Sequence, residues 1–190
     1  MPDTIRAFIA FELPRTILSS MKEIQDRLKN FGFRIKWVPS ENIHLTLKFL
    51  GNINTSQVEK IASAMARSTS GAGTMDLVVK GIGVFPDIKR PRVLWAGIAG
   101  RLDLLHGLKK RLEEELFRED FPKETRAFQS HLTLGRFKGR TSMETLQHAM
   151  DTFKDFRSDV FTVRELYLIK SELKPTGAVY TPLLKIPMRV

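Results

Sequence analysis

The four-residue sequence His-Leu-Thr-Leu occurs twice in this chain, at residues 44–47 and again at residues 131–134. Successive side chains of a β-strand point to opposite faces. Each copy, folded as a strand, therefore presents its histidine and threonine on one face and its leucines on the other. The chain has only four histidines, and this pattern places two of them in the same setting. We predict two strands whose leucines pack into a core and whose polar faces carry a common site.

The hydrophobic pattern predicts an α+β fold. Two kinds of segment follow one another along the whole chain. Alternating or apolar runs are typical of strands, and runs with apolar residues three or four positions apart are typical of helices. Several strands succeed each other without a helix between them, which favours antiparallel pairing. At 190 residues we expect a single domain spanning residues 1–190. The strands are expected at 4–13, 35–38, 42–51, 77–85, 92–98, 128–137, 160–173 and 179–186, and two helices at 101–118 and 141–151. Two further helices are expected, one beginning at Pro14 with its inward residues between Ile17 and Leu28, and one capped by Asn54 or Ser56 with its inward residues between Val58 and Met65.

Composition narrows the class of protein. The chain contains no cysteine, which excludes disulfides and thiolate metal sites. No apolar run approaches the roughly 20 residues of a membrane span, and the charged N-terminal stretch is unlike a signal peptide. We therefore expect a cytoplasmic protein that does not enter membranes. The formal net charge is +10, which favours a polyanionic partner, although an ordinary basic surface gives the same value.

Two histidines, each with a threonine two residues later, suit the cleavage of a phosphodiester. A neutral imidazole accepts a proton from water, and a protonated imidazole donates one to a leaving oxygen. The hydroxyl groups of Thr46 and Thr133 can hold phosphate oxygens as charge develops. Lys48 shares the polar face under strict alternation and serves either phosphate or solvent, whereas Phe49 is expected in the core. A zinc site is disfavoured because no third ligand accompanies the histidines.

The segments around these copies resemble a known family. NIHLTLKFLG and SHLTLGRF are similar to the HxTx signatures of the two-histidine (2H) phosphoesterase superfamily, in particular its RNA 2′,3′-cyclic phosphodiesterase branch, also called 2′-5′ RNA ligases. The resemblance extends to IRAFIAFELP, GIGVFPDIKRPRVLWAGI and LYLIKSELKPTGAVYTPL, and so covers nearly the whole chain. It implies a bilobed fold of two antiparallel sheets related by a pseudo-twofold axis. Helices lie outside, and each lobe contributes one HxTx motif to a central cleft.

The resemblance also implies the chemistry and the site. A terminal 2′,3′-cyclic phosphate of RNA is hydrolysed to a 2′-phosphate without metal or cofactor. His44 is then the proton donor to the leaving O3′ and His131 the acceptor that activates water, while Thr46, Thr133 and Arg136 bind phosphate oxygens. Strict alternation puts Arg136 on the leucine face, and a bulge or strand end at Gly135 would turn it toward the cleft. The implied partner is RNA with cyclic phosphate ends, such as tRNA fragments, and the protein is expected to be a monomer.

Three functions remain open from the sequence. The first is the RNA cyclic phosphodiesterase, which run in reverse is an ATP-independent 2′-5′ RNA ligase. The second is a phosphodiesterase on a small cyclic-phosphate nucleotide, and the third is a non-catalytic RNA- or nucleotide-binding module. Basic residues at 89–92 and 136–140 contact RNA phosphates if they border the cleft, and surface solubility is the competing explanation. Trp37, Phe85 and Trp95 are expected in the core rather than as base-stacking platforms.

Overall fold

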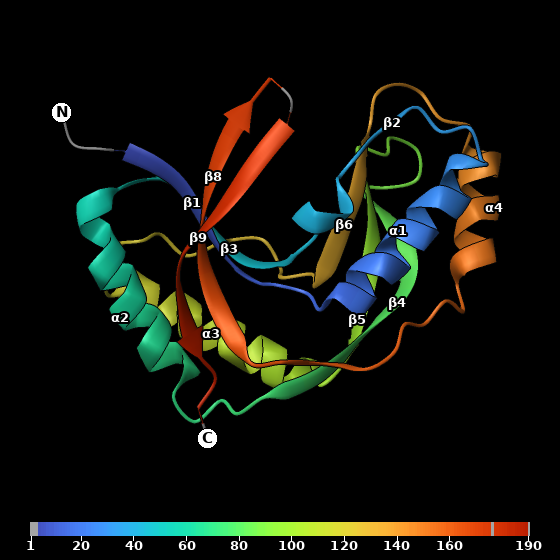
Figure 1. The fold of residues 1–190 in the computed structure, drawn as a ribbon. Coiled ribbons are helices and arrows are strands. Elements are labelled where there is room, and N and C mark those ends of the chain that lie inside the picture. Colours follow the sequence, from blue (N-terminus) through green and yellow to red (C-terminus); the bar gives the residue numbers. More distant parts are fainter. Residues whose placement is uncertain (1–3, 176, 190) are drawn as a thin grey trace.

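The computed structural model describes residues 4–175 and 177–189. Within these residues one curled antiparallel sheet is flanked by α-helices (Figure 1). Its strands are β1 (Thr4–Phe11), β2 (Ile35–Trp37), β3 (Leu45–Asn54), β4 (Met75–Phe85), β5 (Val93–Gly100), β6 (His131–Phe137), β7 (Phe161–Val163), β8 (Glu165–Lys174) and β9 (Gly177–Pro187). The helices are α1 (Arg15–Lys29), α2 (Val58–Thr69), α3 (Leu102–Phe117) and α4 (Met143–Phe153), with short 3₁₀ turns η1 (Ser40–Asn42) and η2 (Thr55–Gln57).

The sheet joins two halves of the molecule at one narrow seam. Its strand order is β7-β4-β5-β6-β3-β1-β8-β9, with β2 added beside β6. Each half is held by long antiparallel pairings, but β3 and β6 pair only at Leu45 and Leu132. The predicted α+β fold with antiparallel strands is therefore confirmed, and the two expected sheets are continuous through this single pair. The two strands that carry the HLTL copies are the ones that meet at the seam.

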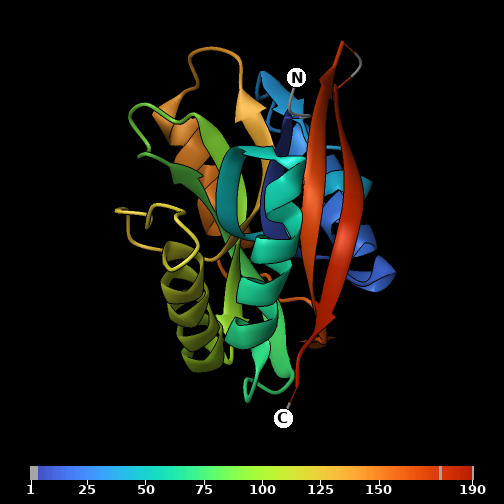
Figure 2. The ribbon, with the colours of Figure 1, turned by 90° about the vertical axis from the view of Figure 1, so that its left-hand side faces the viewer.

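The helices bury one face of the sheet. In α1 the inward residues Ile17, Met21, Ile24 and Leu28 recur at helical spacing and are almost fully buried, as their spacing predicts. Helices α2 and α3 lie side by side (Figure 2). The guanidinium of Arg67 on α2 forms ion pairs with Glu115 of α3 and with Glu119, just after the end of α3. None of the helices in the described part of the chain combines the length and the hydrophobicity needed to cross a membrane.

Capping residues mark the N-terminal ends of two helical segments, η2 and α4. The side chain of Asn54 accepts a hydrogen bond from the backbone N–H of Ser56, and Gln57 accepts one from the backbone N–H of Asn54, which together form a capping box. Ser142 caps α4 by accepting from the backbone N–H of Thr145. Such caps satisfy N–H groups that have no partner inside the helix. They fix the ends of the elements that follow β3 and β6.

A second, smaller cluster of side chains lies on the opposite face of the sheet from the main core. It consists of Phe8, Ala10 and Ile169, with the half-buried Tyr167 and Tyr180 packed against it. These residues come from β1, which pairs with β3, and from β8 and β9, which follow β1 in the sheet. The face that the helices leave uncovered is therefore partly apolar beside β3, where two of these aromatic rings pack against His44.

Candidate active site

The two HLTL copies turn the same residues toward the uncovered face. Leu45 and Leu132 face each other across the seam and are fully buried. Because side chains alternate, the histidine and threonine on either side of each leucine point the other way, and all four are half-buried. The structure thus brings His44, Thr46, His131 and Thr133 together on one face.

The register of the seam fixes how these four residues are arranged. With Leu45 opposite Leu132 in an antiparallel pair, His44 lies across from Thr133, and Thr46 across from His131. The two histidines then occupy a diagonal, for which backbone separations are about 7–8 Å. A diagonal of that length leaves room for a phosphate group between the imidazoles, with one hydroxyl on each side.

Each imidazole is held in the same tautomer by the same local contact. The Nδ1–H of His44 donates to the carbonyl oxygen of Asn42 at 2.8 Å, and the Nδ1–H of His131 donates to the carbonyl oxygen of Gln129 at 2.6 Å. A carbonyl oxygen only accepts hydrogen bonds, so Nδ1 carries the proton in both rings. The partner is the residue two positions before the histidine in both copies. Nε2 is therefore the nitrogen available to exchange a proton in each ring.

Aromatic side chains pack around His44. Its ring stacks on Phe8 with centroids 4.6 Å apart and meets the edge of Tyr180 at 5.2 Å. The side chain of Asn42 donates to the carbonyl oxygen of Ala178 at 2.9 Å, which ties η1 to the start of β9. One residue thus anchors the segment before β3 and supplies the carbonyl that orients the imidazole. The strand that carries Tyr180 is held to the same point.

A different pair of rings packs against His131. Phe85 meets it edge-on at 4.9 Å, and the indole of Trp95 lies 6.3 Å away. Trp95 lies across Gly83 of the neighbouring strand, where an added Cβ would come within 2.3 Å of the indole. Glycine is therefore needed at that position for the indole to lie flat on the sheet beside the histidine.

Burial lowers the pKa of both histidines. Desolvation disfavours the charged ring and is the largest cause for each, outweighing the stabilising hydrogen bond to a backbone carbonyl. The pKa of His44 is lowered further by the nearby His131, and that of His131 by the charge of Arg136. The ring of His131 is thus close enough to that of His44 to lower its pKa. An anion bound between them would act in the opposite direction and favour protonation.

Arg136 reaches the same face through a β-bulge. In the pairing of β5 with β6, Leu94 faces Gly135 but Trp95 faces Thr133, so Leu134 is an extra residue. The bulge reverses the alternation after Leu134: Gly135 is buried, and Arg136 is exposed on the histidine side. The turn toward the cleft expected near Gly135 is therefore present, one residue earlier. The influence of Arg136 on the pKa of His131 agrees with this placement.

The first copy is also followed by a β-bulge, which contradicts the expected placements of Lys48 and Phe49. In the pairing of β1 with β3, Ile9 faces Lys48 but Ala10 faces Thr46, so Leu47 is also an extra residue. Lys48 therefore turns into the interior, where it is 7% exposed, and Nζ donates to Glu113 and to the carbonyl oxygen of Pro122, both at 2.7 Å. Lys48 does not lie on the phosphate-facing side, because strict alternation fails at the bulge.

The same bulge places Phe49 on the histidine side. The prediction that it packs in the core is wrong, since its side chain is 66% exposed and its ring lies 6.0 Å from that of Phe8. Phe49 and Arg136 each follow their histidine by five residues, so the two copies differ at corresponding positions on one face. One side of the site carries an exposed aromatic ring and the other a guanidinium.

The sequence of this chain matches a family of known proteins. The model of the LigT like Phosphoesterase family matches residues 11–95 and 100–180. The chain belongs to this family. A relative from Methanothermobacter thermautotrophicus named RNA 2′,3′-cyclic phosphodiesterase is 31% identical over 93% of this chain and 95% of its own length. One of the same name from Thermotoga maritima is 33% identical over 93% of this chain and 91% of its own.

Solved structures show the same LigT-like fold. The crystal structure of TT0787 of Thermus thermophilus superposes with a TM-score of 0.77 at 29% identity, covering 97% of this chain and 98% of that one. E. coli LigT complexed with 3′-AMP superposes with a TM-score of 0.76, covering 98% of this chain and 99% of that one, but at 21% identity. At that identity the likeness concerns the fold alone.

Several residues of this LigT-like face were not singled out by the sequence. Tyr180 and Phe8 are ordinary members of apolar or alternating strands, and only the three-dimensional pairing of β1, β3, β8 and β9 brings them to His44. Phe85 and Trp95, expected in the core, instead contact His131, whereas Trp37 packs against the main core as expected. Within the described residues no group of three or more His, Cys, Asp or Glu is arranged to hold a metal ion.

Proposed function

We propose that this protein hydrolyses the terminal 2′,3′-cyclic phosphate of RNA to a 2′-phosphate, with the phosphorus between the rings of His44 and His131. The observation that carries the proposal is the paired geometry. Two imidazoles lie on a diagonal of one antiparallel seam, each donates Nδ1–H to the carbonyl two residues earlier, and each has Nε2 available. Base and acid on two sides of phosphorus are what an in-line displacement requires. The names of the relatives point to the same reaction.

The proposed step assigns a different task to each ring. Neutral His131 accepts a proton at Nε2 from a water molecule, whose oxygen attacks phosphorus. The bond from phosphorus to O3′ breaks as protonated His44 donates its Nε2 proton to O3′, so that the phosphate remains on the 2′ oxygen. This division of roles follows the family resemblance. Burial lowers the pKa of His44 in the free protein, and the charge of a phosphate bound between the rings acts in the opposite direction and favours the protonated form that the proton donor requires.

The neighbouring polar groups stabilise the charge that develops on the phosphate. The hydroxyls of Thr46 and Thr133 lie on the same face as the rings and can donate to the non-bridging oxygens. Arg136, turned to this face by its bulge, adds a charged donor. The exposed ring of Phe49 offers the terminal base a surface on which to stack.

We propose that the reaction needs no metal and no second copy of the chain. Proton transfer by two imidazoles and charge stabilisation by hydroxyl and guanidinium groups account for each role that a metal would fill. Both motifs come from one chain, so a monomer contains the complete site. The same site run in reverse joins a 2′,3′-cyclic phosphate end to a 5′-hydroxyl, because every step of a catalysed reaction is reversible. That reverse reaction is an ATP-independent 2′-5′ ligation.

Turnover of a cyclic-phosphate-ended oligoribonucleotide in EDTA tests the proposal. We expect unchanged activity after chelation and a product that carries its phosphate on the 2′ oxygen. His44→Ala and His131→Ala should each reduce kcat by about 10²–10⁴-fold, as expected for the loss of a general acid or base. His106→Ala, at an exposed position on α3, is the matched control. A 3′-phosphate product, or full activity of either active-site variant, would refute the assigned roles. Binding of the oligonucleotide without turnover would instead support the non-catalytic module.

A further inference from the structure

We propose that exposed cations at the outer ends of β2, β5 and β6 form a track for the backbone phosphates of an RNA strand, so that the enzyme prefers an oligonucleotide end to a mononucleotide. This proposal rests on the proposed function, since it assumes that the cyclic phosphate lies between His44 and His131. The track consists of Arg34, Lys36, Lys89, Arg90, Arg92, Arg136, Lys138 and Arg140, all of which are exposed.

The centre of the track is a pair of like charges directly opposite each other. Lys36 of β2 faces Arg136 of β6 across an antiparallel pairing, and Val93 of β5 faces Arg136 from the other side. Directly opposed residues share a face, so Lys36 lies on the histidine side with Arg136. Like charges in this relation destabilise a sheet. A binding site for an anion between or beside them would offset that cost.

No carboxylate in the described part of the chain forms an ion pair with any cation of the track. Elsewhere the protein pairs its cations: Lys48 and Lys109 share Glu113, and Arg67 reaches Glu115 and Glu119. The acidic residue closest in sequence is Asp87, whose carboxylate accepts from the backbone N–H groups of its neighbours in the β4–β5 turn, at 2.8 and 3.0 Å. The track therefore leaves its charges free for an external anion.

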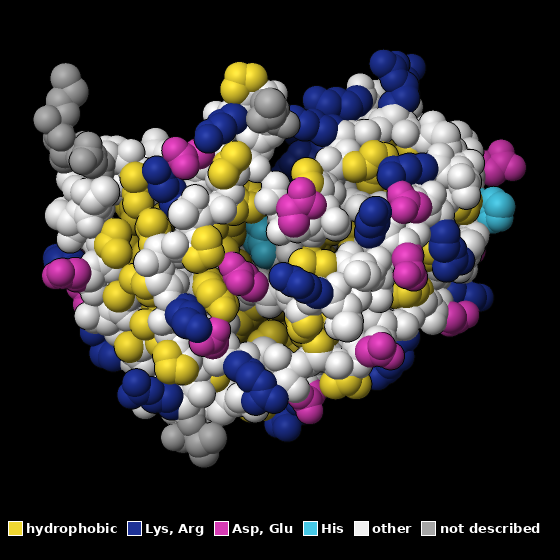
Figure 3. Space-filling model, viewed as in Figure 1, with side chains coloured by type: hydrophobic (Ala, Val, Ile, Leu, Met, Phe, Trp, Pro, Cys, Tyr) yellow, Lys and Arg dark blue, Asp and Glu magenta, His cyan; other side chains and the backbone are white. Residues whose placement is uncertain are grey.

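Backbone hydrogen bonds hold the remaining track residues beside this pair. The N–H of Phe137 donates to the carbonyl of Arg92 at 3.0 Å, and the N–H of Lys138 donates to the carbonyl of Arg34 at 2.7 Å. Three segments far apart in the sequence are thus fixed together at one end of the sheet. Figure 3 shows Lys and Arg side chains gathered at this end, beside the notch between the two halves of the molecule.

The track starts at the catalytic face and leads away from it. Arg136 is close enough to lower the pKa of His131, and its backbone lies about 15 Å from that of His131 along β6 at the usual rise of a strand. The long side chain of Arg136 bridges part of that distance toward the cyclic phosphate, but cations farther from His131 lie beyond the reach of a mononucleotide whose phosphate lies between the histidines. Cations beyond Arg136 can therefore contact only the preceding nucleotides of a longer strand. Such contacts act on backbone phosphates and carry no sequence preference.

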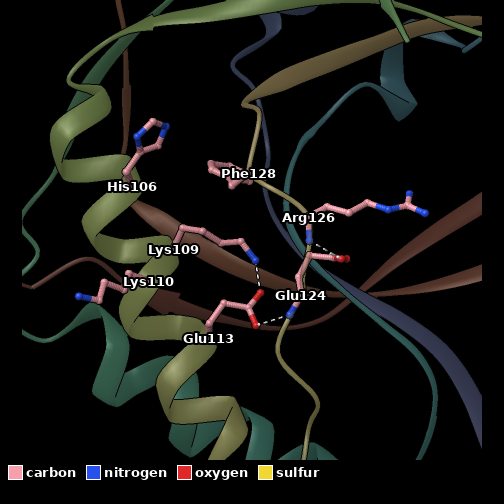
Figure 4. A pocket seen from close by; sticks show the side chains of 7 residues that line it. All are labelled: His106, Lys109, Lys110, Glu113, Glu124, Arg126 and Phe128. Atoms are coloured by element: carbon pink, nitrogen blue, oxygen red, sulfur yellow. Dashed lines mark hydrogen bonds and ion pairs between the residues drawn. The ribbon is translucent and has the colours of Figure 1, made fainter. Parts of the chain in front are cut away.

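A groove beside the segment that leads into β6 is the competing path, and it suits RNA less well. This groove of about 320 Å³ lies between α3 and the segment before β6, and it contains Lys109, Lys110 and Arg126 (Figure 4). Acidic residues lie among these cations, and Glu113 already pairs with Lys109. In Figure 4 the side chains of Lys110 and Arg126 point away from the groove on opposite sides. Its charges are partly neutralised and do not converge on one anion.

The test compares two substrates in the double variant Lys36→Ala/Lys138→Ala. For a cyclic-phosphate-ended octaribonucleotide we expect kcat/KM to fall about tenfold or more, mainly through KM, while turnover of a mononucleoside 2′,3′-cyclic phosphate stays unchanged. The salt dependence of the octanucleotide reaction should weaken by about 1.4 in logarithmic slope, since two contacts to a single strand are removed. Lys110→Ala is the matched control and should change neither substrate.

The outcomes separate this proposal from the proposed function. Turnover of the mononucleotide reports on the histidine pair alone, so its absence in the wild-type protein would argue against the site rather than the track. Equal losses for both substrates, or an octanucleotide reaction that is unaffected, would overturn the track. The thermal midpoint adds a further check: removing Lys36 relieves its repulsion with Arg136, so the midpoint of Lys36→Ala should not fall. A clear fall would indicate a structural role for Lys36 and would also contradict the proposal.

Discussion

The burial of Lys48 leads to a prediction that differs from the one made by strict alternation along the strand, which would place Lys48 on the histidine side. In the structure Lys48 Nζ donates to the carboxylate of Glu113 and to the carbonyl oxygen of Pro122, both at 2.7 Å. The side chains of Lys48 and Glu113 are 7% and 13% exposed. Lys48→Met keeps most of the aliphatic stem but removes two hydrogen bonds from a charged donor. Since such bonds contribute about 1.5–3 kcal/mol each, and Met restores part of the packing, we expect a loss of about 2–4 kcal/mol in unfolding free energy.

The carboxylate at the centre of this cluster should matter more. Glu113 also accepts from Lys109 and from the backbone N–H of Glu124. Although burial raises the pKa of Glu113, these hydrogen bonds together hold it below its usual value. Glu113→Gln leaves two buried ammonium groups without a counter-charge, so we expect a loss of about 3–5 kcal/mol. Because the carboxylate has a lowered pKa, its contribution is complete above the unfolded value near 4.5 and is lost as the pH falls below it.

Urea unfolding and mononucleotide turnover, measured on the same samples, decide whether Lys48 lies in the core or on the histidine side of the sheet. We expect the folded fraction of Lys48→Met to keep kcat and KM within about threefold of wild type at 25 °C, because Nζ lies on the core side of the sheet. Lys170→Met, which removes a half-exposed ion pair with Glu172, is the control and should cost no more than about 1 kcal/mol. A hundredfold loss of turnover in Lys48→Met without loss of stability would instead show that the amine of Lys48 binds phosphate.

Further predictions concern the site itself. Thr46→Val and Thr133→Val should each lower kcat by about 10²–10³-fold by removing a donor to the phosphate, and Ser at either position should restore most of it; full activity of the valine variants would exclude that role. Ring NMR titrations of His44 and His131 should give a pKa below 6.5 in the free protein and a higher one with inorganic phosphate bound. Because the folded pKa is lowered, stability should fall as the pH drops below about 6.5, and less so in a double His→Gln variant. Arg136→Gln should raise the pKa of His131 and move the acidic limb of the kcat/KM profile to higher pH; an unmoved limb would mean that the guanidinium does not face the ring.

Regular alternation explains what the sequence predicts correctly. The helices and strands lie close to the expected ranges, because apolar spacing reports directly on which face is buried. The exception is the strand expected at 160–173, which is divided into β7, paired with β4, and β8, paired with β1. The face shared by His44, Thr46, His131 and Thr133 follows from the alternation within each HLTL copy, and their meeting depends on one further fact, the pairing of Leu45 with Leu132. The sequence suggests that pairing only through the repeat and the family resemblance.

The residues that sequence reasoning misplaced lie after a bulge or on a distant strand. Lys48 and Phe49 exchange faces because Leu47 is an extra residue, and no composition rule marks that leucine as bulged. Tyr180 reaches His44 only because β9 pairs with β8, which in turn pairs with β1 beside β3. A contact that depends on a chain of several pairings is not encoded in any local pattern. It appears only when the order of strands in the sheet is known.

The two bulges together introduce into a nearly symmetric pair of motifs the asymmetry that the proposed reaction requires. In both HLTL copies the histidine is followed by the same three residues, donates Nδ1–H to the carbonyl two residues earlier and has the same tautomer. The motifs alone therefore do not distinguish a proton donor from an acceptor. Each copy is followed by a bulged leucine, and the fifth residue after each histidine returns to the shared face. That residue is Phe49 in one copy and Arg136 in the other. A cation beside His131 favours its neutral form, which suits a base, while His44 lies among aromatic rings with no cation contributing to its pKa except His131 itself. The asymmetry therefore enters at the first residue after the HLTL copies that returns to the shared face.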